Sequence, residues 1–403
     1  MKKVAIWLCL LLIGLCPLAG AAENLSGIAC LGEERIAYSG SVDGRTRGVF
    51  LLGSDGSAQR IYDQDAMLLA QSENAVLVMD NLLGTAVLLD ENGAMLAELA
   101  GYYAGALAEA GTFYTGNWAV SEDGAKKRTL FDAATEDMPY LLPLAVIEEY
   151  LYFLDARAYG PSVFGSGAMA AASLCRVPVS GGAVETISGP GTRIIGCSDG
   201  AIVYERRNFW YDSADASLEM QVSEGLYRFS TDAPETWLAA LYSEQNGAPV
   251  SYAFVEQGVI YGIQAAEASG ESAPPLLKRL TVQGEALEDI PLPPAELCSA
   301  EGTQLLLAQN AYAETASGTR QADAILLLDT ADGSLRTLNE GREDVLFFAG
   351  SPPSLCLKNG HVFWISYNTR LAAMELYCQN LSTGLVQMLA CGYSWAADEE
   401  AVG

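Results

Sequence analysis

The sequence predicts an all-β fold, a β-propeller of eight four-stranded blades, because one hairpin unit recurs along most of the chain. The clearest copy is 174–187 (LCRVPVSGGAVETI), where an apolar run, a Gly-Gly turn and a second run follow one another. A lone hairpin is only marginally stable in water, so copies of the unit must cover one another. Five further segments share this register: 49–61, 87–99, 277–290, 325–338 and 376–389.

A second pair of short strands precedes each hairpin, which completes a four-stranded unit. The units begin at Ile28, Leu68, Ala106, Leu144, Ile194, Ser251, Glu296 and Ser354, at spacings of 38 to 58 residues. Four short strands repeated at such a period are typical of a propeller blade. The polar run 122–128 interrupts the third unit. If that unit is an insertion, the propeller has seven blades. A single β-sandwich would not accommodate about 380 residues.

The first 21 residues have the pattern of a secretory signal. Lys2 and Lys3 precede an apolar run, 4–15, and small residues follow up to Ala21. We therefore expect cleavage near Ala21, a propeller over 22–390 and a short acidic tail over 391–403. Lipidation at Cys16 is disfavoured because Leu15, a large residue, precedes it. The mature protein is expected to be secreted or associated with the cell surface.

The composition is strongly acidic, with a net charge of −28 over the whole chain. Such a charge repels nucleic acid and anionic membranes. Half of the residues are hydrophobic and only 18% are charged, so a folded core is expected rather than disorder. No later apolar run approaches the roughly 20 residues of a membrane-spanning helix. The expected partner is an extracellular glycan or peptide, and the expected state is a monomer.

Seven cysteines remain after cleavage, an odd number in an exported chain. Four of them, Cys30, Cys197, Cys298 and Cys356, fall late in the first strand of a unit, where a small apolar residue fits. A ring of thiols that binds metal is the alternative, and a disulfide between Cys30 and Cys356 is the one pairing to examine. No C-x-x-C motif occurs, and we predict no metal site or cofactor.

Long connections between the second and third strands are the expected binding surface, because binding residues concentrate on loops. These connections are 156–173, 206–225, 265–275, 310–324 and 367–374. Paired arginines beside consecutive aromatic residues could form a platform for a sugar or peptide, or hold a carboxylate. Alternatively, the aromatic residues extend the strand and the arginines pair with nearby acids. The candidate ligand-binding residues are Tyr159, Arg206, Arg207, Phe209, Trp210, Tyr211, Tyr312 and Tyr367.

No catalytic residue is assigned. The single histidine, His361, leaves little scope for a Ser-His-Asp or Cys-His arrangement. Paired carboxylates could support glycoside hydrolysis, but with 50 acidic residues some proximity arises by chance. The segment 329–334 (DTADGS) faintly resembles a calcium loop, and an ordinary hairpin turn explains it equally well. The carboxylates considered for hydrolysis are Asp155, Asp212, Asp215, Glu267 and Glu314.

The repeated unit resembles the blades of a known family over most of the mature chain. LYFLD (151–155) followed by LCRVPVSGG (174–182), and IVYER (202–206) followed by GLYRFSTD (225–232), are similar to blades of exported bacterial β-propellers related to lipoprotein-receptor propellers. That family has no known function and is common in secreted proteins of Gram-positive bacteria. The resemblance implies the fold and an extracellular setting, and it implies no catalytic residues. The receptor-type Tyr-Trp-Thr-Asp tetrapeptide is absent from every unit.

Three functional hypotheses follow from the sequence. The first is an exported binding or interaction module that uses the long connections on one face. The second is a carbohydrate-active enzyme with acid and base carboxylates near the channel mouth. The third is a structural repeat protein of the cell surface.

Overall fold

The computed structural model describes residues 23–25, 27–158, 172–212, 217–239, 250–265, 274–315, 318–338, 355–368 and 373–392. The chain divides into two compact units, Met1–Trp237 and Leu238–Gly403. Strands make up nearly all regular structure in the described residues, together with the 3₁₀ helix η2 (Thr135–Tyr140). No helix in these ranges has both the length and the apolar character needed to cross a membrane.

The described strands of the first unit form five antiparallel meanders, which we call blades 1 to 5. A short strand, β1 (Glu23–Leu25), pairs with the first strand of blade 1. Blade 1 consists of β2 (Ala29–Leu31), β3 (Arg35–Ser41), β4 (Arg47–Gly53) and β5 (Ala58–Tyr62). Blade 2 consists of β6 (Met67–Gln71), β7 (Ala75–Asp80), β8 (Thr85–Asp90) and β9 (Met95–Ala100). Blade 3 consists of β10 (Ala106–Glu109), β11 (Thr112–Thr115), β12 (Trp118–Ser121) and β13 (Lys127–Thr129). The strands of blades 4 and 5 are β14 (Leu141–Ile147), β15 (Tyr150–Asp155), β16 (Ser173–Pro178) and β17 (Glu185–Ser188); β18 (Thr192–Ser198), β19 (Ala201–Asp212), β20 (Ser217–Ser230) and β21 (Ala233–Ala239).

The second unit contains three further meanders among its described residues, blades 6 to 8. Blade 6 consists of β22 (Val250–Glu256), β23 (Val259–Gln264), β24 (Leu276–Thr281) and β25 (Ile290–Pro291). Blade 7 consists of β26 (Glu296–Glu301), β27 (Gln304–Thr315), β28 (Gly318–Asp329) and β29 (Leu335–Thr337). Blade 8 consists of β30 (Leu355–Lys358), β31 (His361–Asn368), β32 (Ala373–Asn380) and β33 (Val386–Cys391).

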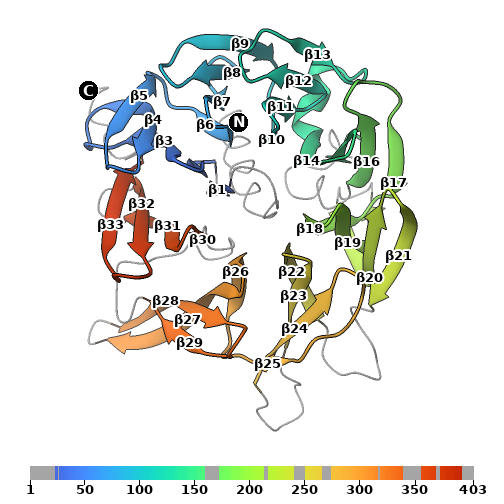
Figure 1. Ribbon diagram of the computed structural model, residues 1–403, viewed down its shortest axis with the longest axis vertical. Helices are drawn as coiled ribbons and strands as arrows, with labels where there is room; N and C mark the ends of the chain where they lie inside the picture. Colours follow the sequence, from blue (N-terminus) through green and yellow to red (C-terminus); the bar gives the residue numbers. More distant parts are fainter. Residues whose placement is uncertain are drawn as a thin grey trace. The chain divides into compact units, whose positions relative to one another are not determined.

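These meanders confirm the predicted fold class: the chain is a β-propeller. Figure 1 labels strands of every blade in chain order. The interrupted third unit forms a complete blade, with the polar run at the turn between β12 and β13. Each predicted unit start lies within three residues of the start of a first strand, and the hairpin of 174–187 is β16 and β17.

The central strands of a blade are buried on both faces, which explains their unbroken apolar runs. In β7, Leu77 and Met79 join a buried cluster with side chains of blades 3 and 4. Val76 and Val78, which alternate with them, join a second cluster with side chains of blade 1. Because successive residues of a strand point to opposite faces, blade 2 is covered by both of its sequence neighbours.

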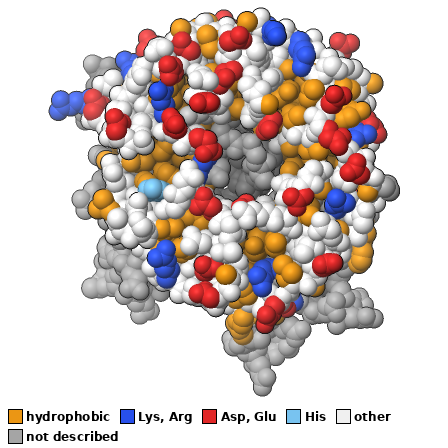
Figure 2. All heavy atoms as spheres, in the orientation of Figure 1, with side chains coloured by type: hydrophobic (Ala, Val, Ile, Leu, Met, Phe, Trp, Pro, Cys, Tyr) orange, Lys and Arg blue, Asp and Glu red, His pale blue; other side chains and the backbone are white. Residues whose placement is uncertain are grey.

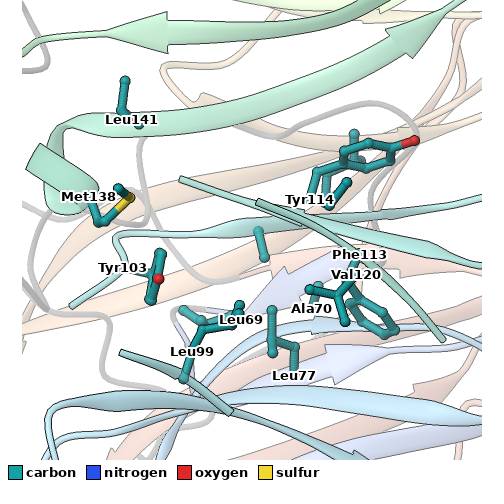
Figure 3. Close-up of a cluster of buried hydrophobic side chains, with 14 of the residues drawn as sticks. Leu69, Ala70, Leu77, Leu99, Tyr103, Phe113, Tyr114, Val120, Met138 and Leu141 are labelled. Atoms are coloured by element: carbon teal, nitrogen blue, oxygen red, sulfur yellow. The ribbon is translucent and has the colours of Figure 1, made fainter. Parts of the chain in front are cut away.

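Figure 3 shows part of the first cluster. Ala70 and Leu77 of blade 2 lie beside Phe113 and Val120 of blade 3. Met138, from η2, belongs to the same cluster and is 3% exposed, so the 3₁₀ helix contributes to the core rather than only linking blades.

Carboxylates at the end of the first strand tie neighbouring blades together in the second unit. Glu301, the last residue of β26, accepts backbone N–H groups of Asn359 at 2.6 Å and Gly360 at 3.2 Å in the β30–β31 turn. Glu256, the last residue of β22, accepts the N–H of Gly302 at 3.2 Å in the β26–β27 turn. We call this contact, a first-strand carboxylate on the first turn of the next blade, an inter-blade cap.

The first unit ties blades 1 to 3 by other side chains. Gln71 of β6 accepts the N–H of Ala37 at 3.0 Å and donates to the carbonyl of Arg35 at 3.1 Å. Glu122 of blade 3 accepts the N–H of Asn74 at 3.0 Å in blade 2, and also accepts from the hydroxyl of Ser72. Desolvation raises the pKa of Glu122, but these hydrogen bonds outweigh it and hold the pKa below its ordinary value.

Candidate binding site

A cavity of about 190 Å³ lies among the first strands of blades 3, 4 and 5. This volume has room for about six water molecules. β10, β14 and β18 supply most of the lining, and the β18–β19 turn with the start of β19 supplies the rest. The lining residues are Leu107, Glu109, Ala145, Val146, Ile147, Cys197, Ser198, Gly200 and Ala201.

Tight turns place the polar residues of the cavity. Glu109 is the last residue of β10 and pairs with Thr112 across a two-residue turn. Ser198 is the last residue of β18 and pairs with Ala201 across Asp199 and Gly200. Both residues of each turn have positive φ, for example 51° at Asp199 and 69° at Gly200, which is the geometry of the shortest hairpin turns. These turns hold the two side chains at rigid strand ends.

Glu109 occupies the position that Glu256 and Glu301 use for the inter-blade cap, but it forms no such cap. Among the described residues, the Glu109 carboxylate accepts no hydrogen bond and has no ion-pair partner, and it lines the cavity instead. The first turn of the next blade carries Glu148 and Glu149, whose negative charges oppose the approach of a third carboxylate.

Burial sets the electrostatic character of the cavity. It raises the pKa of the Glu109 carboxyl above its ordinary value, because the ionised form has lost hydration without gaining a partner from the described residues. It also raises the pKa of the Cys197 thiol to about 12, so this thiol stays neutral at physiological pH and is a poor nucleophile. No Lys, Arg or His is among the lining residues of the described cavity. The ionisable groups of the described lining are therefore one carboxyl group, Glu109, and one neutral thiol, Cys197.

The raised pKa of Glu109 predicts that Glu109→Gln is more stable than the parent protein at neutral pH, because the substitution removes a poorly hydrated charge. The expected gain is only about 0.5 kcal/mol, since the site is partly open to solvent. A raised folded-state pKa means that stability falls as pH rises and the native carboxylate ionises. The gain should therefore vanish near pH 4, about the unfolded-state pKa. Urea denaturation across this range measures it.

Glu73→Gln is the matched control, because Glu73 is an exposed carboxylate in the corresponding first turn of blade 2. Its effect on the free energy of unfolding should be small at every pH tested. An advantage of Glu109→Gln that stays constant from pH 4 to pH 7 would contradict the assigned cause.

The predicted arginine and aromatic residues lie mostly in strands rather than loops. The connection 206–225 was expected to be irregular, but β19 and β20 continue through most of it and pair as far as Asp212 with Ser217. β27 and β28 likewise replace the expected loop 310–324, pairing from Gln304 to Thr315. We call these two extended hairpins the β-arms. Both loop predictions were wrong because a hairpin can continue through polar sequence when its backbone ladder is satisfied.

Of the predicted ligand-binding residues, Arg206 is the one whose side-chain contacts are described. Its guanidinium pairs with Glu235 and lies 4.5 Å from the ring centroid of Tyr227. For Arg206, this matches the alternative expectation that the arginines pair with nearby acids. Arg207, Phe209, Trp210 and Tyr211 are positions in β19, Tyr312 is in β27 and Tyr367 is in β31; Tyr159 lies outside the described residues.

The other candidates have local structural partners. Asp155 binds Arg157 in a bidentate pair, with Nε–Oδ1 at 3.0 Å and Nη2–Oδ2 at 2.7 Å, so it is not an open catalytic acid. His361 begins β31 as expected, with Nδ1 2.9 Å from the carbonyl of Asn359 and Nε2 3.0 Å from the amide of Asn380. Asp212 and Glu314 are positions in the β-arms, and Asp215 and Glu267 lie outside the described residues.

The cysteines and the calcium-like segment provide no metal site in the described residues. None of the seven described cysteines forms a disulfide, so the considered Cys30–Cys356 bond is not present. In the β28–β29 turn, Asp329 accepts the N–H of Ala331 at 2.9 Å and Asp332 accepts that of Ser334 at 2.8 Å. Local turn contacts therefore explain the DTADGS segment.

Sequence reasoning missed Glu109, Cys197 and Ser198 as a group. A signal was present, since Glu109, Glu256 and Glu301 share the last position of a first strand. The loss of the cap depends on the next blade, however, which a comparison of single units does not reveal. The cavity also lies at the strand-1 to strand-2 turns, whereas the long connections leave the opposite ends of the strands.

No protein-family model and no curated protein matches the chain. Among solved structures, it is similar to apo AztD from Citrobacter koseri, with 12% identity over 84% of this chain and 90% of that chain and a TM-score of 0.47. It is also similar to a eukaryotic initiation factor (13% identity, 89% and 96% coverage, TM-score 0.44) and to a chain of the nidogen/laminin complex (13%, 70% and 92%, 0.33). These likenesses concern the fold and indicate no ligand.

Proposed function

We propose that this protein is an exported β-propeller that acts as a binding module, with the cavity of blades 3 to 5 as its ligand site. The observation that supports the proposal most directly is Glu109, a carboxylate that lines a mainly apolar cavity and has no partner among the described residues. Unpartnered polar groups in an apolar pocket are typical of ligand sites, because the ligand supplies the missing partner. The charged and small-residue pattern of residues 1–21 supports export.

Binding without turnover fits the cavity better than hydrolysis does. Glycoside hydrolysis needs two carboxyl groups that flank the scissile bond, and the described lining supplies one, Glu109. On the face in Figure 2, Asp and Glu side chains are distributed among Lys and Arg side chains rather than gathered in one patch. Acidic surfaces of this kind favour solubility.

The β-arms are a second candidate surface, which would serve a larger glycan or peptide. Beyond the last pair with β18 at Arg206, β19 runs on for six residues to Asp212, or about 20 Å. The sequence places Phe209, Trp210 and Tyr211 along this extension. The proposal also includes that this chain is related to exported bacterial propellers similar to lipoprotein-receptor propellers.

A ligand screen on residues 22–403 tests both surfaces. Small organic cations, oligosaccharides and peptides are scored by thermal shift and ligand-observed NMR, since a ligand of the folded state raises apparent stability. We expect a small-molecule hit whose binding is lost in Glu109→Gln and kept in a triple alanine variant of Phe209, Trp210 and Tyr211. Loss only in the triple variant would move the site to the β-arm, and a screen with no hits would overturn the proposal.

A further inference from the structure

We infer that the cavity of blades 3 to 5 takes a small primary alkylammonium ion, with the ammonium group on Glu109 and the alkyl chain against the apolar wall. This assignment rests on the proposed function, because it names the ligand class for the same cavity.

The lining selects for a short apolar body. Ala145 is 8% exposed and presents its methyl group to the partly open cavity, while Leu107 and Ala201 are fully buried and pack behind this apolar wall. Val146 and Ile147 add half-buried aliphatic surface. Space for about six waters limits the ligand to a few non-hydrogen atoms. A chain of about four carbons fits this size, and each methylene removed from water strengthens binding by about fourfold.

The polar groups select for a cation that donates several hydrogen bonds. The Glu109 carboxylate accepts hydrogen bonds and cannot donate them. A primary ammonium has three donors and a positive charge, so it can form a charge-assisted hydrogen bond with this carboxylate. A carboxylate ligand would be repelled by Glu109, and a neutral alcohol has one donor and no charge.

The same lining argues against two other cations. Quaternary ammonium ions are recognised mainly by aromatic cages, and no aromatic residue is among the lining residues of the described cavity. Divalent metal ions need several oxygen, nitrogen or sulfur ligands, and the described residues contain no group of three or more suitable side chains. The net charge of −28 raises the local concentration of any cation near the protein.

The first experiment is calorimetric titration of residues 22–403 with n-butylammonium chloride, with 1-butanol, sodium butyrate and tetramethylammonium chloride as comparison probes. We expect n-butylammonium to bind about tenfold or more tightly than 1-butanol, and butyrate not to bind. Glu109→Gln should weaken n-butylammonium binding by about 10- to 100-fold, as expected for a charge-assisted hydrogen bond. Glu73→Gln, the exposed control, should leave it unchanged.

A second measurement places the bound probe. Cys197 lines the cavity, and although its raised pKa makes alkylation slow, iodoacetamide traps the small thiolate fraction over hours at mildly alkaline pH. A bound ligand should slow this reaction further, which mass spectrometry follows. Cys378, a half-buried thiol in β32, is the control and should react at an unchanged rate. Protection of Cys197 by n-butylammonium in the parent protein, and its loss in Glu109→Gln, would support the assignment.

The outcomes separate this inference from the proposed function. If butanol, butyrate or tetramethylammonium protects Cys197 as well as n-butylammonium does, the cavity is a ligand site but the assigned class is wrong. If n-butylammonium binds without protecting Cys197, it binds elsewhere and the assignment fails. If no probe and no hit from the broader screen protects Cys197, both the assignment and the proposed site fail.

Discussion

Replacing Phe153 by alanine should lower the free energy of unfolding by about 3–5 kcal/mol. Phe153, in β15, is fully buried and stacks on Phe131 with ring centroids 5.1 Å apart and an interplanar angle of 12°. Phe131 follows the last strand of blade 3, so the stack joins blades 3 and 4. Truncation would remove the stack and leave a cavity in a cluster that also contains Leu151 and Val177.

Equilibrium denaturation of residues 22–403 in guanidinium chloride measures this loss. Trp237→Ala is the control, because Trp237 is 57% exposed and an exposed aromatic residue contributes little to stability. Its effect should stay within about 0.5 kcal/mol. If Phe153→Ala costs less than about 1 kcal/mol, the contact between blades 3 and 4 is not the tightly packed core described above.

The fold could be predicted from the sequence because its signals are local and repeated. The turn chemistry of 174–187 and the starts of the units each depend on a few adjacent residues. The runs in β7 and β8 are apolar at nearly every position because both faces of these strands are covered, by different clusters. The repeat period then indicated how many such units the chain contains.

The ends of the long hairpins were harder to predict. Strands of 12 and 14 residues, such as β19 and β20, are at least about twice the usual length. Register shifts beside Arg207 also interrupt the alternation of residues that a strand pattern requires. The sequence around this point therefore favoured a loop.

The candidate site could not be predicted because it depends on contacts between units. Glu109 and Glu301 stand at the same place in their own blades, and nothing local distinguishes them. What differs is the turn of the following blade: Asn359 and Gly360 donate to Glu301, whereas Glu148 and Glu149 follow Glu109. An unpartnered carboxylate is visible only when the neighbouring blade is in place.

Gly93 lies in the turn between the third and fourth strands of blade 2, and replacing it by alanine should lower the free energy of unfolding by about 2–5 kcal/mol. Gly93 lies in the β8–β9 turn with φ of 85°, a conformation that costs an alanine about 1–2 kcal/mol. A Cβ at this position would also lie 2.3 Å from the carbonyl oxygen of Ile61, in β5 of blade 1. Because that neighbour is backbone, blade 1 and blade 2 must separate to admit the methyl group.

Gly56→Ala separates the conformational cost from the contact between blades. Gly56 occupies the corresponding β4–β5 turn and has nearly the same φ of 81°, but a methyl group added there would meet no atom within 4 Å. It should therefore cost only about 1–2 kcal/mol. The difference between the two variants in urea denaturation, expected at about 1–3 kcal/mol, measures the packing of blade 2 on blade 1. Equal losses would show that the turn conformation alone retains glycine here, and that the close approach to Ile61 contributes nothing to stability.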